Sequence, residues 1–158
     1  MSTTSQLAKR FREVLLDGKW IANTNFKDQL VDVTWEQATT KIDSLNTIAM
    51  LAFHIDYYIA GLINVFEGGD LEIRDKYSFD LPPIENEEQW ETLKDKLWDD
   101  AEKFALLLEQ MPDSKMNEVF VDEKYDTYLR NIDGMIEHCY YHLGQITLIK
   151  KLILSKHK

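Results

Sequence analysis

The sequence predicts an all-α protein, a four-helix bundle. Four long segments repeat apolar residues at spacings of three and four, which is the period of a helix that buries one face. No segment alternates apolar and polar residues over enough positions to predict a β-strand. At 158 residues the chain has the usual size of one domain with one core, so we expect a single domain over residues 1–158.

The first predicted helix lies at the beginning of the chain. Residues 2–5 offer N-cap side chains, Gly18 is a natural end, and the apolar stripe between them is Leu7, Phe11, Val14 and Leu15. Residues 19–26 predict a connection with an aromatic anchor, in which Trp20 plugs the core. Thr34 opens a capping-box pattern, so a short helix is expected to begin there.

The second predicted helix runs for some six turns and carries a histidine near its middle. Ser44 or Asn46 caps it, and Gly68-Gly69 ends it. Its apolar stripe is Leu45, Ile48, Ala52, Ile55, Ile59, Leu62 and Phe66. His54 shares a face with apolar neighbours, so we expect its imidazole to look inward.

Residues 70–85 predict a crossover connection between the second and third helices. Charged and apolar residues alternate there, and Pro82 and Pro83 forbid a helix. Connections of this length in a compact domain often carry function, so residues 77–79 (Tyr-Ser-Phe) can overhang a pocket. A loop that only packs over one end of the bundle is the alternative.

Two further helices complete the predicted bundle. The third begins after Asn86, an N-cap with a glutamine three positions later, and ends before Pro112. Trp90 and Trp98 belong to its apolar stripe, and its acidic side is expected to be solvated rather than catalytic. The fourth helix is expected from about residue 126 to residue 154.

The fourth helix carries two histidines four positions apart. Such positions lie almost one above the other on a helix, so His138 and His142 point the same way. Two imidazoles at this spacing can share a divalent ion at roughly 2.0–2.1 Å each. We expect His54 to complete a set of three nitrogens with an open coordination position, which suits zinc, nickel or iron(II). Taken singly, a helical histidine is more often a hydrogen-bonded core or surface residue, and His157 lies at a lysine-rich end.

Other kinds of catalytic site are not predicted. No histidine has a glutamate three positions before it, which excludes the Glu-x-x-His pairs of di-iron bundles, and the metalloprotease pattern His-Glu-x-x-His is absent. Cys139 points about 100° away from its neighbour His138 on a helix, so it is expected to pack as a small apolar residue. A Gly-rich phosphate-binding loop is also missing.

Composition limits the partners and the compartment. A surface that neutralises phosphates needs an excess of basic residues, whereas this chain has a formal charge of −10. We therefore expect no contact with nucleic acid. The uninterrupted apolar runs are shorter than a membrane span, and the first residues do not resemble a signal peptide, so no membrane partner is expected. One cysteine cannot form an internal disulfide, which together with these features predicts a cytoplasmic protein.

Two histidine-bearing stretches resemble one known family. Residues 46–55, Asn-Thr-Ile-Ala-Met-Leu-Ala-Phe-His-Ile, are similar to the second-helix segment that leads into the first metal ligand of the DinB/YfiT-like superfamily. Residues 138–146, His-Cys-Tyr-Tyr-His-Leu-Gly-Gln-Ile, match the H-x-x-x-H-x-G-Q-I pattern that carries its other two ligands. The turn at residues 18–20 and the glycine pair at residues 68–69 also fall where this family tends to have them. The resemblance covers essentially the whole chain.

The resemblance implies a four-helix bundle with a long crossover between helices two and three, commonly a homodimer. It also implies a divalent metal ion, nickel or zinc, at His54, His138 and His142. Iron and manganese are alternatives, since three histidines accept several first-row ions. Characterised relatives include bacillithiol S-transferases and a mycothiol-dependent maleylpyruvate isomerase, and many members have no known activity. The family name refers to DNA-damage induction, which describes expression and implies no DNA contact.

Two functions from different classes follow from these residues. The first is a metal-dependent enzyme that activates a small-molecule thiol or water for attack on an electrophile, with three histidine ligands and no separate protein nucleophile. Tyr58 and Gln145, each about one turn beyond a ligand, are candidates to line its open side, or else to pack in the core or orient a ligand. The second function is a non-catalytic module, in which the metal is structural or the domain serves dimerisation or sensing.

Overall fold

The structure is a computed structural model that describes residues 1–156, so His157 lies outside the described residues. These residues form six α-helices and no β-strand, which confirms the predicted all-α class. The helices are α1 (Thr3–Arg12), α2 (Phe26–Leu30), α3 (Trp35–Ala38), α4 (Ile48–Phe66), α5 (Glu87–Gln110) and α6 (Tyr128–Ser155). A π-helical turn (Glu13–Asp17) continues α1, and short 3-10 turns occupy Asp75–Tyr77, Asp113–Asn117 and Glu123–Tyr125.

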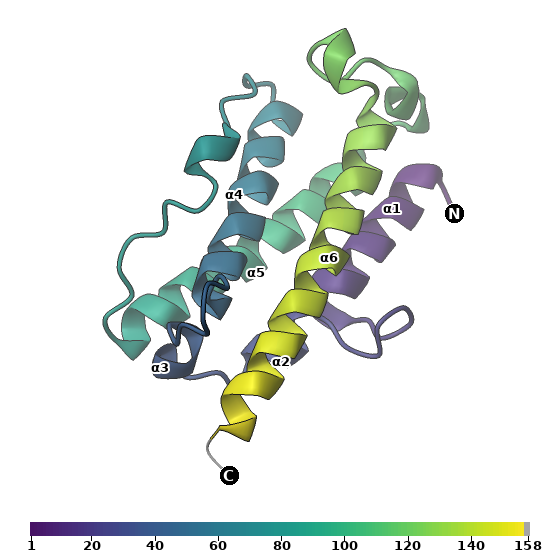
Figure 1. The fold of residues 1–158 in the computed structure, drawn as a ribbon. Helices are drawn as coiled ribbons and strands as arrows, with labels where there is room; N and C mark the ends of the chain where they lie inside the picture. Colours follow the sequence, from purple (N-terminus) through teal and green to yellow (C-terminus); the bar gives the residue numbers. More distant parts are fainter. Residues whose placement is uncertain (157–158) are drawn as a thin grey trace.

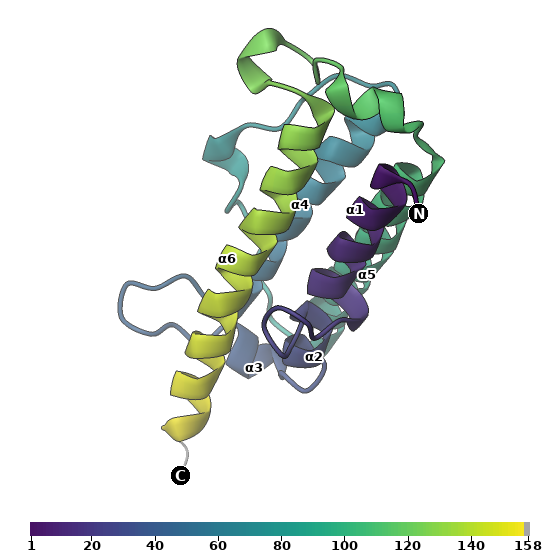
Figure 2. The same cartoon turned by 90° about the vertical axis from the view of Figure 1, so that its right-hand side faces the viewer.

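Four of the helices are packed along one another around a common core. Helix α4 packs against α5 and α6, and α1 packs against the same two helices. Figure 1 shows α4 and α6 side by side with α5 behind them, and Figure 2 shows α1 in front of α5. The segment of residues 67–86 leaves the end of α4, runs back along its outer side and enters α5 (Figure 1).

Each of the six helices begins at a side chain that accepts a hydrogen bond from its first turn. These N-caps are Ser2, Asn25, Thr34, Thr47, Asn86 and Thr127. Thr34 forms the predicted capping box with Gln37, because each side chain bonds the other residue's backbone N–H. The expected cap of the second long helix was wrong: Thr47, rather than Ser44 or Asn46, precedes α4.

Two glycines end helical segments for different reasons. Gly68 follows α4 with φ of +94°, a left-handed conformation that favours glycine. Gly18 follows the π-helical turn with φ of −103°, and there the requirement is space, since a Cβ would lie 2.0 Å from the Glu13 side chain. Both ends therefore agree with the predicted positions, although only Gly68 needs the unusual backbone.

The predicted role of Trp20 was wrong. Its side chain is 87% exposed, and the anchor of this region is Phe26, the first residue of α2, which is fully buried. The Asn25 side chain accepts a hydrogen bond from the Asp28 amide and donates one to the Gly18 carbonyl 3.0 Å away. These bonds start a helix where a connection was expected, and they close the intervening residues into a loop outside the core.

The buried hydrophobic side chains form one cluster, to which all four long helices contribute. Trp90 of α5 is fully buried and its indole N–H donates to the Val33 carbonyl at 2.7 Å, whereas Trp98 is only partly buried. Among the described helices, α4 alone is long and apolar enough to cross a membrane by composition, and 67% of its apolar window is buried inside the structure. A core helix has these properties too, and α4 carries two buried polar residues, His54 and Asp56.

Candidate metal centre

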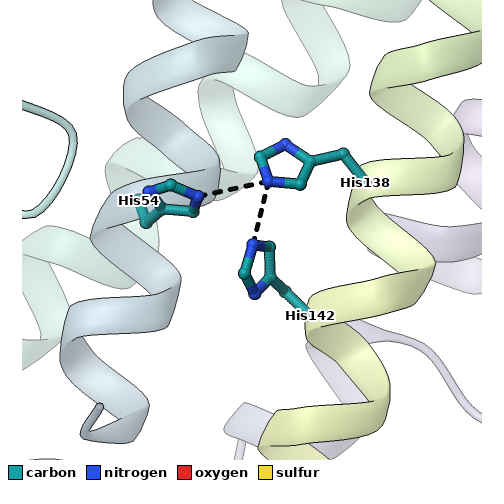
Figure 3. Close-up of side chains that lie close together, drawn as sticks. All are labelled: His54, His138 and His142. Atoms are coloured by element: carbon teal, nitrogen blue, oxygen red, sulfur yellow. Dashed lines mark hydrogen bonds between the residues drawn. The ribbon is translucent and has the colours of Figure 1, made fainter. Parts of the chain in front are cut away.

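The structure brings three of the histidines together between α4 and α6. His54 projects from the middle of α4, and His138 and His142 project toward it from successive turns of α6 (Figure 3). One ring nitrogen of each lies within 4.8 Å of the others. His54 and His142 are buried, and His138 is half-buried. These three residues are therefore close enough to hold one metal ion.

The spacing of the nitrogens suits shared coordination. The Nε2 atom of His138 lies 3.2 Å from that of His54 and 2.9 Å from that of His142. Two nitrogens that bind one ion at roughly 2.0–2.1 Å are separated by about 3.3 Å at a tetrahedral angle and about 2.9 Å at a right angle. The observed separations fall at these two values.

The outer nitrogens of two rings fix which atoms face the centre. His54 Nδ1 lies 3.2 Å from the Ser78 carbonyl oxygen, and His142 Nδ1 lies 2.6 Å from Gln145 Oε1. Because both partners accept hydrogen bonds, each Nδ1 carries the proton and each Nε2 presents a bare lone pair. Such outer partners hold an imidazole in the tautomer and orientation that a metal requires.

Burial keeps the three imidazoles neutral. Loss of hydration lowers the pKa of His54 and of His138 to about 4, and the neighbouring histidines lower both further. The pKa of His142 is lowered for the same first reason, against the Gln145 hydrogen bond, which raises it. Because two of the three neutral rings carry their proton on Nδ1, at most one of the three facing nitrogens is protonated. The other facing nitrogens present lone pairs that repel one another. A cation resolves that repulsion.

The segment of residues 67–86 between α4 and α5, called the crossover below, covers one side of His54. The Phe79 ring stacks on the imidazole with centroids 4.0 Å apart and planes 8° from parallel. Tyr58, one turn along α4, meets the same imidazole edge-on at 5.0 Å. Of the three residues expected near a pocket, Ser78 and Phe79 thus lie against His54, whereas Tyr77 is 46% exposed. The group that orients His54 is a backbone carbonyl of the crossover, and Asp56 lies on another face of α4.

A hollow of about 590 Å³ opens beside His138. It lies between α4, α6 and the two connections, and Tyr58 and His138 are in its wall. The other lining residues are Leu62, Leu71, Ile73, Arg74, Asp75, Phe120, Tyr125, Arg130, Asn131, Gly134 and Met135. A larger groove of about 940 Å³ exists elsewhere, but none of the three histidines lines it. Of these two hollows, only the smaller one therefore reaches the histidine cluster, at His138.

The two residues expected at the open side occupy different places. Tyr58 lines the hollow, and its hydroxyl donates to Asp75 Oδ1 at 2.6 Å. Burial first, and then that carboxylate, raise the pKa of Tyr58 to about 12, so the phenol stays a hydrogen-bond donor. Gln145 is not among the residues that line the hollow, and its contact is with His142 Nδ1.

Cys139 contributes no nucleophile to this centre. The side chain is fully buried in the core, and burial raises the pKa of its thiol far above the usual range. It packs as the small apolar residue that its place on the helix predicted. Any thiol chemistry at the histidines therefore needs a thiol from outside the chain.

Several residues around the hollow were not identified from the sequence. Arg74 and Asp75 lie in the crossover, where no periodicity relates them to the histidines. The sequence did contain a signal for Asn131, because this residue lies seven positions before His138 and therefore on the same face of α6. Arg130, its neighbour, also reaches the hollow.

Comparison with known proteins adds no relative. No family model, no curated protein and no solved structure matches this chain. The interpretation of the centre consequently rests on its geometry and on the motifs that carry it.

Proposed function

We propose that the protein binds one divalent metal ion at His54, His138 and His142 and uses it in catalysis. The observation that carries this proposal is the convergence of three Nε2 atoms, two of them held as bare lone pairs by outer hydrogen bonds. A histidine that served only packing would have no need to direct its lone pair at two others. Nickel or zinc is the preferred ion because the family resemblance implies it, and iron(II) or manganese is the alternative.

The donor set favours a catalytic ion over a structural one. Structural zinc is normally closed by four protein ligands, whereas catalytic zinc keeps three and leaves one position open. Among the described residues the cluster that can hold a metal has three members, all histidines. The half-buried His138 also borders the hollow, so the open position is reachable from outside.

We further propose membership of the DinB/YfiT-like superfamily, with α1, α4, α5 and α6 as its four-helix bundle and residues 67–86 as its crossover. The H-x-x-x-H-x-G-Q-I motif and the contacts of these four helices support this assignment. A cytoplasmic homodimer is the corresponding expectation for the whole molecule. It rests on the resemblance and on the composition.

The proposed reaction is attack by a small-molecule thiol or by water on an electrophile. A divalent ion held by neutral imidazoles lowers the pKa of a bound thiol or water and orients the resulting nucleophile. The protein's own groups prepare the site: Gln145 and the Ser78 carbonyl fix the ligand rings, and Phe79 shields one face of His54 from water. Tyr58, held protonated against Asp75, presents a polar group in the wall of the hollow.

Metal analysis tests the first half of the proposal. Elemental analysis is done on untagged protein, because a polyhistidine tag would itself bind nickel. We expect about one divalent ion per chain, and none above background after His138→Ala. Stoichiometric metal in that variant would contradict the ligand assignment.

Turnover tests the second half. A panel of small-molecule thiols is incubated with a monochlorobimane-like and a fosfomycin-like electrophile, and product formation is compared between the wild type and His54→Ala. We expect at least one thiol to react faster with the wild type. Equal rates for all thiols, with metal present, would favour the non-catalytic module.

A further inference from the structure

A second hollow lies on the side of α4 that faces away from the histidines. It is a groove of about 940 Å³ between α4, residues 72–86 and the first turns of α5. Its α4 wall includes Phe53, Asp56, Tyr57 and Ala60, whose spacing of three and four places them on one helix face. Apolar groups make up most of the surface of the lining as a whole, which includes Pro82 and Pro83. The groove and the metal centre therefore share a helix but use different faces.

A buried carboxylate in this wall lacks part of its bonding. The Asp56 side chain is 5% exposed, and its Oδ2 atom accepts a hydrogen bond from Lys96 Nζ at 2.7 Å. Its Oδ1 atom is inaccessible to solvent and has no hydrogen-bond partner among the described residues. A buried polar atom without a hydrogen-bond partner destabilises the folded state, so an unpaired Oδ1 is unusual inside a folded protein.

Lys96 compensates the Asp56 charge only in part, because burial and then the neighbouring Asp100 raise the pKa of Asp56 above its usual range despite the bond to Lys96. The same ammonium also bonds Asp100 Oδ2 at 2.6 Å, so two carboxylates share one cation. Around the groove, three carboxylates (Asp56, Glu72 and Glu88) stand against the single ammonium of Lys96. The ionisable groups of the lining therefore favour a positively charged occupant.

We propose that this groove is a second binding site, independent of the metal centre, for a small organic cation with an alkyl or aryl body and one ammonium head. The body lies against the apolar wall, which includes Tyr57 and Ile73, and the head pairs with Asp56. The carboxylate turns about its Cβ–Cγ bond, a torsion with broad minima, to present Oδ1 to the groove. The aromatic faces of Phe53 and Tyr57 add attraction for an ammonium group.

Calorimetric titration of the full chain with three probes of similar body tests the charge preference. The probes are phenylbutylammonium, phenylbutanol and phenylbutyrate. We expect the ammonium to bind about tenfold more tightly than the alcohol, because a charge-assisted bond replaces a neutral one. The carboxylate probe is expected to bind most weakly. Equal affinities for ammonium and alcohol in the wild type would overturn the proposal.

The Asp56→Asn variant tests the residue. It should bring the ammonium to the affinity of the alcohol while alcohol binding persists. The matched control is Glu123→Gln, which removes the same charge from an exposed turn outside the groove and should keep the preference. A preference that survives Asp56→Asn would overturn the assignment. Metal content, measured in both variants, should stay at the wild-type level.

A third variant keeps the test decisive if Asp56→Asn fails to fold. Ala60→Phe fills the groove without altering any charge, so binding of all the probes should be lost. Retention of the ammonium preference in that variant would place the site elsewhere. A second copy of the chain is the other possible occupant of the groove, and sedimentation of the same samples tests for it. A wild-type dimer that Ala60→Phe converts to a monomer would show that the groove is an interface between copies, and would overturn the proposal.

Discussion

The two faces of α4 handle buried polarity in opposite ways. On the face toward α6, His54 has its outer nitrogen bonded to the protein and its inner nitrogen 3.2 Å from the inner nitrogen of His138. On the face toward the groove, Asp56 has one oxygen bonded to Lys96 and the other without a partner. In the first case the outer nitrogens of His54 and His142 are bonded to the protein, and the inner nitrogens are left for a shared cation. In the second case a buried carboxyl group keeps one oxygen without a hydrogen-bond partner.

This difference explains why the geometry of the histidine centre is fixed more precisely than that of the groove. The histidine centre is positioned by three segments, since α4 and α6 supply rings and the crossover supplies the Ser78 carbonyl and the Phe79 ring. The groove carboxylate is held through one flexible lysine whose side chain is 56% exposed. We therefore expect a precise ion geometry at the first site and a tolerant recognition of charge and shape at the second.

The largest effect is expected from His138→Ala, which removes the ring between the other two. Two remaining nitrogens rarely keep a first-row ion against competing ligands, so metal content should fall from about one ion per chain to background. The matched control is His157→Ala, which should retain the metal. Elemental analysis after dialysis gives both values. An equal loss in the two variants would break the comparison, because the assigned face of α4 would no longer be the metal-binding one.

A smaller effect on the same readout is expected from Gln145→Ala. Its Oε1 atom lies 2.6 Å from His142 Nδ1, and loss of such an outer partner typically weakens metal affinity about 10–100-fold. Competition with a chromophoric chelator measures the affinity. Thr147→Ala is a suitable control, because its hydroxyl donates within α6 to the Leu143 carbonyl, 2.8 Å away, and contacts no ligand ring. An unchanged affinity in Gln145→Ala would mean that helix packing alone orients His142.

Acid should destabilise the metal-free protein through the same histidines. Burial lowers the pKa of His54 and His138 to about 4 in the folded chain, from an ordinary value of 6.5. Below pH 6.5 these histidines therefore bind protons in the unfolded chain but not in the folded chain. The free energy of unfolding consequently falls as the pH is lowered to about 4. Thermal unfolding after chelation, followed between pH 7.5 and about 4, measures this. His138→Gln should show a shallower decline, and an identical decline would assign the effect to other groups.

Helical periodicity is local, and it accounts for what could be predicted. The stripes of the long helices and the common face of His138 and His142 follow from spacing alone, and an inward His54 follows from its apolar neighbours. The capping box at Thr34 is equally local and was predicted for that reason. Element type and ligand candidates were thus accessible from the sequence.

Contacts made by the crossover were not accessible in this way. The acceptor for His54 is the Ser78 carbonyl, a backbone group that every residue possesses, so no residue type marks it. The Asp75 carboxylate meets Tyr58 only because the connection folds back along α4. The prediction that Trp20 is buried was wrong for a related reason. Its apolar side chain predicted burial, but the hydrogen bonds of Asn25 close a loop that places Trp20 outside the core. Such features depend on the path of the chain rather than on a repeat.

Adjacent tyrosines on α4 give the smallest expected effects and the finest test of its two faces. The Tyr57 hydroxyl bonds the backbone N–H and carbonyl of Arg74, and the Tyr58 hydroxyl donates to Asp75. These three bonds fasten the crossover to α4, so Tyr57→Phe and Tyr58→Phe should each lower the free energy of unfolding by about 1 kcal/mol, measured by urea denaturation. Metal content should remain unchanged in both. Only Tyr58→Phe should alter the rate of the thiol reaction, because only that hydroxyl lies in the hollow beside His138. Equal rate changes in the two variants would mean that the crossover acts on the centre as a rigid cover and that the two faces of α4 are not independent.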